Sequence, residues 1–205
     1  SIDELKKELK NRFPGCHPSR ANPRPTPKVT QQTLRAGRGP WPTGISTVDA
    51  LLPGGGFPGG RLSEITGPSS SGKLMTAFGC AAQATQAKHP VAWVDLAGTF
   101  YPPSAHSAGV QLKRLLILRP KDSTQALKAV DILIRGRAFP LIILDWGLEP
   151  SKSSIDPEVL GTAIARLNGL LSMGSEALVL LPTPQPARDA IRHSATIRLG
   201  VERVP

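Results

Sequence analysis

The stretch GPSSSGKL at residues 67–74 decides the fold of this 205-residue chain. It follows residues 61–66 (RLSEIT), which predict a strand, and it runs into residues 73–87, whose pattern predicts a helix. A glycine-rich loop between a strand and a helix is the context of a phosphate-binding loop. Its glycines let the backbone N–H groups turn inward, and the start of the helix adds partial positive charge. The stretch therefore predicts an α/β fold of the P-loop class.

The loop also defines the candidate nucleotide ligands. Lys73 would reach the terminal phosphates of a bound nucleotide. In a functional loop the lysine is followed directly by Ser or Thr, and the hydroxyl of that residue binds magnesium. Here this position is Leu74, whose side chain has no oxygen. Thr76 lies two residues further and would point away on a helix. ATP is therefore a weakly held candidate, the identity of any cofactor stays open, and no metal ligands are expected. The candidate cofactor-binding residues are Gly67, Ser69, Ser70, Ser71, Gly72 and Lys73.

Downstream of the loop, apolar strands alternate with helices. This alternation predicts a mostly parallel sheet with helices on both faces. Such sheets bind their ligands at the carboxyl ends of the strands, where Asp95 and Asp145 stand. A structural role for both acids is the favoured interpretation, and magnesium binding through a water is the alternative for Asp145. The expected strands are 91–95, 115–118, 140–145, 177–181 and a half-exposed terminal strand within 194–204, and the expected helices are 124–134 and 157–171.

The N-terminal part has a different character. Residues 1–13 predict a short amphipathic helix that needs a partner surface, because a helix of this length is marginal alone. Residues 14–44 are rich in proline, which favours an extended linker. We therefore divide the chain into an N-terminal helix and basic Pro-rich arm at 1–44 and a P-loop core at 45–205. The candidate partner-binding side chains of the helix are Ile2, Leu5, Leu9 and Phe13.

The net charge is strongly positive, at +10 with a pI near 10.2. Nine of the cations lie between residues 5 and 40, against one acid, Glu8. This excess favours a polyanionic partner such as nucleic acid, with Arg35 and Arg38 as candidate contacts, and a solvated basic surface is the alternative. No stretch reaches the roughly 18 uncharged apolar residues of a membrane helix, so no membrane partner is expected.

The run from Gly44 to Lys73, GISTVDALLPGGGFPGGRLSEITGPSSSGK, resembles the start of the RecA recombinase core. That family reads TG-x-x-x-LD, then a double glycine, then G-R-[IV]-x-E-I-x-G-P-x-x-S-GK. Later elements follow in the same order, so the resemblance covers roughly residues 1–205. It implies a RecA-like P-loop core, and an N-terminal helix that packs on a neighbouring protomer in a filament. It also places Arg188 and Arg192 in the loop at the DNA-binding position, as candidate phosphate contacts.

The departures from the RecA pattern all affect the residues needed for ATP hydrolysis. Ala97 stands where RecA has the glutamate that orients the attacking water, so the general base is missing. Leu74 replaces the magnesium ligand, and Pro182-Thr183 replaces the glutamine that senses nucleotide. The resemblance thus implies a pseudo-ATPase without catalytic residues rather than an enzyme.

A degenerate RecA site is similar to that of the ImuA proteins, which accompany ImuB, an inactive Y-family polymerase relative, in SOS mutagenesis. This resemblance implies a DNA-repair accessory factor for error-prone translesion synthesis in the bacterial cytoplasm, associated with the nucleoid. Its expected partners are RecA or its filament, an ImuB-like protein, and DNA. Packing is the favoured interpretation for Trp41, Trp93 and Trp146, and Trp41 in the linker is the strongest candidate among them for an exposed partner anchor. The alternatives are a DNA-dependent ATPase of the recombinase class and a SulA-like inhibitor of cell division.

Overall fold

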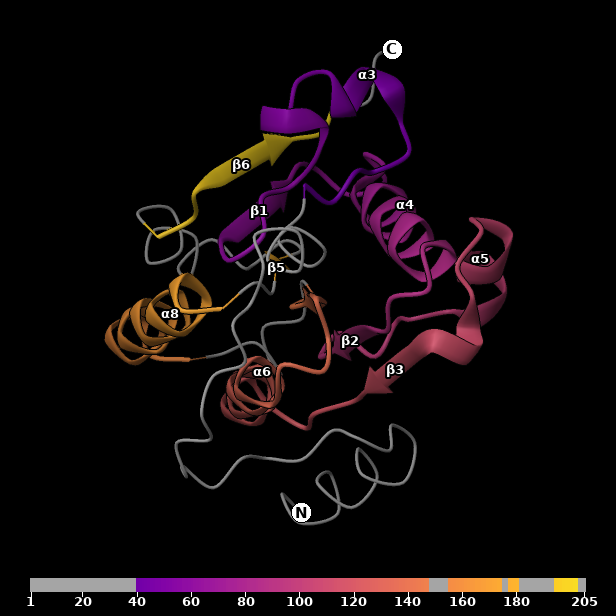
Figure 1. Cartoon of the computed structure of the whole chain (residues 1–205). Helices are drawn as coiled ribbons and strands as arrows, with labels where there is room; N and C mark the ends of the chain where they lie inside the picture. The colour runs from indigo at the N-terminus through magenta and orange to yellow at the C-terminus, as the bar shows by residue number, and fades with distance from the viewer. Residues whose placement is uncertain (1–39, 148–154, 175–176, 181–193, 203–205) are drawn as a thin grey trace, which may run out of the picture.

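The computed structural model describes residues 40–147, 155–174, 194–202 and the backbone of 177–180. A six-stranded sheet of order β3-β2-β4-β5-β1-β6 forms the centre, and all of its strand pairs are parallel. Figure 1 shows α4 and α5 on one side of this sheet and α6 and α8 on the other. The α/β prediction is therefore confirmed, including the helices on both faces. No helix in the described ranges is long and apolar enough to cross a membrane.

The elements follow the predicted order. The strands are β1 (Leu62–Thr66), β2 (Val91–Asp95), β3 (Leu115–Leu118), β4 (Leu141–Asp145), β5 (Ala177–Leu180) and β6 (Ile197–Gly200). The α-helices are α3 (Ser46–Asp49), α4 (Lys73–Gln86), α5 (Pro102–Ser107), α6 (Ser123–Gly136) and α8 (Pro157–Ser172), and the 3-10 turns are η1 (Pro53–Gly55) and η2 (Leu112–Arg114).

Two buried clusters explain why the central strands are continuous apolar runs. In β2, Ala92 and Val94 pack with α6 and α8, whereas Val91 and Trp93 pack with α4 and α5. The alternation follows from the strand period of two, which points successive side chains to opposite faces. Because helices cover both faces, both sets are apolar, as expected for a parallel sheet.

The edge strand β6 is held to β1 by an ion pair. Glu64 on β1 has a fully buried side chain, and its Oε2 lies 2.7 Å from Nε and 2.6 Å from Nη2 of Arg198 on β6. The two residues are directly opposite in the register. Oε1 of Glu64 has no hydrogen-bond partner among the described residues. Arg198 is therefore the group that compensates the buried negative charge of Glu64.

Trp41 is buried rather than exposed. Its side chain is 6% exposed, and its ring makes an edge contact with His89 at 5.5 Å between centroids. Its backbone exchanges two hydrogen bonds with Phe57, at 2.7 and 2.8 Å. The packing interpretation is therefore confirmed for Trp41, and the alternative of an exposed anchor was wrong, because the segment before α3 folds onto the α4 side of the core and buries the indole.

Candidate functional site

The predicted strand–loop–helix arrangement of the phosphate-binding loop is confirmed. β1 ends at Thr66, the loop begins with Gly67 at φ +147°, and Gly72 at φ +98° leads into α4. Gly67 has no room for a side chain, since a Cβ there would lie 2.0 Å from the carbonyl oxygen of Val201. No side chain caps the start of α4. This geometry fits a phosphate, because backbone N–H groups at an uncapped helix start attract an anion.

Lys73 folds over its own loop. Its side chain is largely buried, and its Nζ donates to the carbonyl oxygens of Gly67, at 2.7 Å, and of Pro68. Nζ also lies 3.5 Å from Oγ of Ser71, which is itself buried. These oxygens hold the ammonium at the mouth of the loop. Phosphate oxygens would compete for the same donor.

The residues after the lysine do not fit a magnesium ion. Leu74 is half-buried and packs against the α4 side of the core. Thr76 is buried, and its hydroxyl donates to the carbonyl oxygen of Gly72 at 3.1 Å, within its own helix. Magnesium requires oxygen ligands in nearly octahedral geometry, and neither side chain supplies one here. The loop therefore fits phosphate, but it does not fit the metal that a functional P-loop holds beside it.

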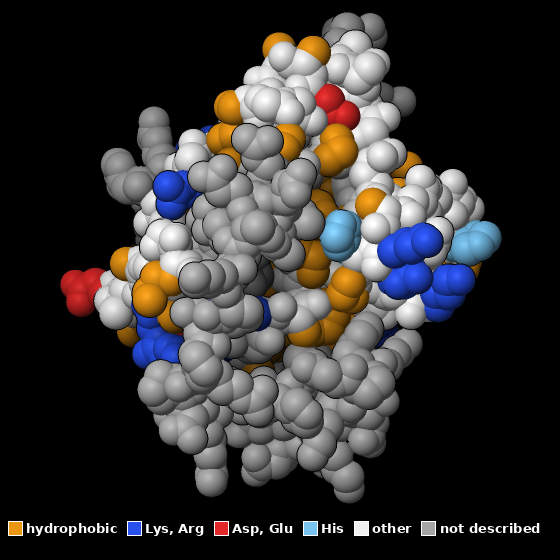
Figure 2. Space-filling model, in the orientation of Figure 1, with side chains coloured by type: hydrophobic (Ala, Val, Ile, Leu, Met, Phe, Trp, Pro, Cys, Tyr) orange, Lys and Arg blue, Asp and Glu red, His pale blue; other side chains and the backbone are white. Residues whose placement is uncertain are grey.

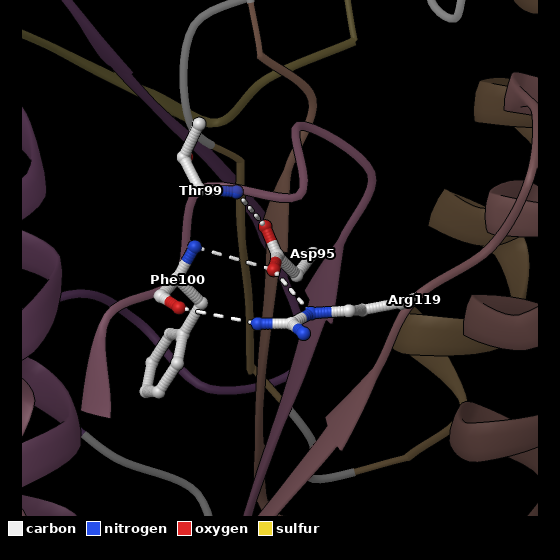
Figure 3. Close-up of polar contacts among 4 residues, drawn as sticks. All are labelled: Asp95, Thr99, Phe100 and Arg119. Atoms are coloured by element: carbon white, nitrogen blue, oxygen red, sulfur yellow. Dashed lines mark hydrogen bonds and ion pairs between the residues drawn. The ribbon is translucent and has the colours of Figure 1, made fainter.

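Asp95, at the end of β2, is engaged by both of its oxygens (Figure 3). Its Oδ1 accepts from the backbone N–H of Thr99 at 3.0 Å, and its Oδ2 accepts from Phe100 N at 3.2 Å. Nε of Arg119, which follows β3, lies 3.1 Å from the same Oδ2. Arg119 also donates through Nη2 to the Phe100 carbonyl at 3.2 Å. The carboxylate thus fixes the turn after β2, which supports the structural interpretation of Asp95.

This turn carries Ala97, which the resemblance described in the sequence analysis places at the position of the catalytic glutamate. The backbone N–H groups of Leu96 and Ala97 donate to the carbonyl oxygen of Asp145, at 3.0 and 3.3 Å. A Cβ built on Gly147 would lie 2.7 Å from the methyl group of Ala97. The ends of β2 and β4 therefore touch here, and the side chain at this contact is a methyl group, which cannot accept a proton.

Asp145 lies opposite Asp95 in the register of β2 and β4. Burial raises its pKa from 3.8 to about 6, the negative charge of Asp95 adds to this increase, and a hydrogen bond from Gly147 N at 3.2 Å opposes it. A carboxylate with a raised pKa at the carboxyl edge of a sheet is either a functional group or a stability cost. The two roles differ in their dependence on pH.

We expect Asp145→Asn to raise the free energy of unfolding by about 2 kcal/mol near pH 8, and by much less near pH 4. The folded pKa lies above the unfolded value, so the native state holds the proton more tightly. The cost of burying the charge is therefore absent below the unfolded value, and it grows as pH rises towards about 6. Urea unfolding at several pH values measures it, and an equal gain at every pH would contradict the assignment.

Part of the predicted site lies in the described structure. It brings together the six candidate cofactor-binding residues in one loop, with Ser69 and Ser70 exposed. The division of the chain at residue 44 stays a prediction. The other predicted site residues also stay predictions, because they lie outside the described ranges: Ile2, Leu5, Leu9, Phe13, Arg35, Arg38, Arg188, Arg192 and Pro182-Thr183. The sequence analysis missed Arg119. Its contact with Asp95 depends on the pairing of β2 with β3, for which the local sequence carries no signal.

Comparison with known proteins agrees with this geometry. The family described as the RecA N-terminal domain matches residues 32–178. The proteins named Protein RecA from Streptomyces ambofaciens and from a Nocardioides species are 39% and 30% identical in alignments 188 residues long, and each alignment covers 80% of this chain. The alignments cover 50% and 54% of those proteins, so the chain spans about half the length of the curated relatives it matches. Because the family match covers most of the sequence, the chain belongs to the RecA N-terminal domain family.

Proposed function

We propose that this chain is a non-catalytic RecA-like accessory factor of damage-induced, error-prone translesion synthesis. The observation that supports it is the contrast within one site. The phosphate loop joins β1 to α4 through glycines with positive φ and keeps Lys73, yet Leu74 and Ala97 stand where the resemblance places the magnesium ligand and the catalytic glutamate of RecA. Loss of both groups removes the positioning of metal and water on which phosphoryl transfer depends.

The proposed partners follow from the RecA and ImuA resemblances. A RecA-like core without turnover can join RecA or its filament, and can connect it to an ImuB-like polymerase relative in the bacterial cytoplasm. DNA is a further proposed partner, supported by the net charge of +10. In the view of Figure 2, lysine and arginine side chains gather at two sides of the molecule, and the acidic side chains stand apart from the right-hand group.

The direct test is phosphate release from ATP and magnesium by the purified chain, with and without single-stranded DNA. We expect no release above that of the Lys73→Ala variant under either condition, because no side chain at position 97 can accept a proton. Streptomyces ambofaciens Protein RecA, assayed in parallel, is the positive control. Turnover that depends on Lys73 and is stimulated by DNA would instead identify a DNA-dependent ATPase.

The translesion role needs a second, cellular test. In the source bacterium, removal of the gene is expected to lower the frequency of damage-induced mutants while homologous recombination continues. Reintroduction of the Lys73→Ala form should restore mutagenesis if the role depends on protein contacts rather than turnover. A deletion strain with unchanged damage-induced mutagenesis would contradict the proposal.

A further inference from the structure

We infer that the loop of this chain binds a nucleoside triphosphate free of magnesium, and that the metal contributes nothing to its affinity. The inference rests on the proposed function, since it concerns the same non-catalytic loop. It goes further by stating which form of the nucleotide the site takes. Three features carry it: the loop backbone, the side chains beside it and the balance of charge.

The groups that contact phosphate are independent of a metal. The positive φ angles of Gly67 and Gly72 shape the loop, and the start of α4 has no side-chain cap. Lys73 Nζ already lies among oxygen acceptors, at 2.7 Å from the Gly67 carbonyl. A phosphate oxygen would exchange a carbonyl partner for an anionic one, which gives a stronger hydrogen bond. Phosphate binding therefore needs only the backbone and this lysine.

The groups that would hold magnesium are missing or engaged. Leu74 removes the hydroxyl, and the Thr76 hydroxyl is bonded to Gly72. Asp95 uses both oxygens for Thr99, Phe100 and Arg119, and these contacts would have to break before it accepted a water from the metal shell. Asp145 is buried, and its Oδ1 accepts a hydrogen bond from Gly147 N. A magnesium ion on the phosphates would keep its waters and gain no direct ligand from Leu74 or Thr76.

The charge balance favours the free nucleotide. A triphosphate without magnesium carries more negative charge than its magnesium complex, so a site that binds it needs a positive environment. Lys73 places a positive charge at the loop, and Arg119 offsets the negative charge of Asp95 at the neighbouring strand end. These two cations oppose the phosphate charge without a metal ion.

The experiment is a calorimetric titration of the whole chain with ATP, in excess magnesium chloride and in excess EDTA. We expect dissociation constants that agree within about twofold, or tighter binding in EDTA. Lys73→Ala should weaken binding at least about tenfold in both buffers. Thermal unfolding of each variant without nucleotide controls for its folding.

Position 74 provides the matched pair. Leu74→Thr restores the hydroxyl of a functional loop, so its affinity should become about tenfold higher in magnesium than in EDTA. Leu74→Ala loses the same packing without gaining an oxygen, and its two dissociation constants should stay equal. The difference between the two variants isolates the hydroxyl.

The outcomes separate this inference from the proposed function. Magnesium-dependent binding by the unmodified chain, or no binding in either buffer, overturns the inference but leaves a non-catalytic accessory role intact. Nucleotide turnover in magnesium overturns the proposed function instead. Equal affinities in both buffers, together with a magnesium response gained only in Leu74→Thr, support the inference.

Discussion

Replacing Arg198 by alanine is expected to lower the free energy of unfolding by about 3 kcal/mol. The variant leaves the Glu64 carboxylate fully buried inside the sheet without its ion-pair partner. Removal of one member of a buried pair costs much more than the pair contributes, because the remaining charge is neither solvated nor paired. The Arg198 side chain is 34% exposed, which places the expected effect at the lower end of the range for such pairs. Urea unfolding followed by tryptophan fluorescence measures it.

Two controls accompany this variant. Arg166→Ala breaks an ion pair with Asp131 in which the arginine side chain is 63% exposed, so it should cost no more than about 1 kcal/mol. The double variant Glu64→Gln/Arg198→Ala removes the buried charge together with its partner, and should recover more than half of the loss. Equal losses for Arg198→Ala and Arg166→Ala would show that the Glu64 charge does not depend on Arg198.

Gly67→Ala is expected to abolish nucleotide binding and to destabilise the fold by at least about 2 kcal/mol. A Cβ at this position would lie 2.0 Å from the Val201 carbonyl oxygen and 2.8 Å from Ser71 Oγ, on a backbone with φ of +147°. The phosphate-binding loop would have to move away from the chain at the end of β6, which would change the backbone geometry that binds phosphate. Nucleotide titration and urea unfolding together measure the two effects.

Gly55→Ala is the matched control for this substitution. Gly55 also has a positive φ, of +83°, but a Cβ there meets nothing within 4 Å. It should cost only about 1 kcal/mol of backbone strain and leave nucleotide affinity unchanged. If Gly67→Ala behaved like Gly55→Ala, close approach of the loop to β6 would not be the reason for glycine at position 67.

The sequence predicted the fold well because its signals are local. The apolar runs of β2 and β4, each ending in an aspartate, specify buried parallel strands without knowledge of their neighbours. The phosphate loop was equally clear, because glycine spacing, lysine and flanking elements lie within one short stretch. The partners that bury Trp41 were not predictable in this way, since its contacts with Phe57 and His89 arise only in the folded chain.

Arg119 illustrates the same limit at the site. It is separated from Asp95 by 24 residues, and the contact arises because β2 and β3 are neighbours in the sheet. Nothing in the local sequence indicates that the strand after α5 pairs with β2. Asp95 was correctly interpreted as structural, but its partners required the strand order. Contacts between side chains on neighbouring strands therefore cannot be predicted from local sequence until the strand order is known.

The contacts that hold the turn after β2 bear on whether this protein can signal its nucleotide state to a partner. Molecular switches depend on a segment beside the nucleotide that changes shape with the state of the last phosphate. Here Arg119 and Asp95 hold that turn through the protein's own atoms. We therefore expect the surface that this turn presents to a partner protein to be the same with and without nucleotide in the phosphate loop. Partner binding is thus expected to vary with the amount of this protein and not with the state of its nucleotide.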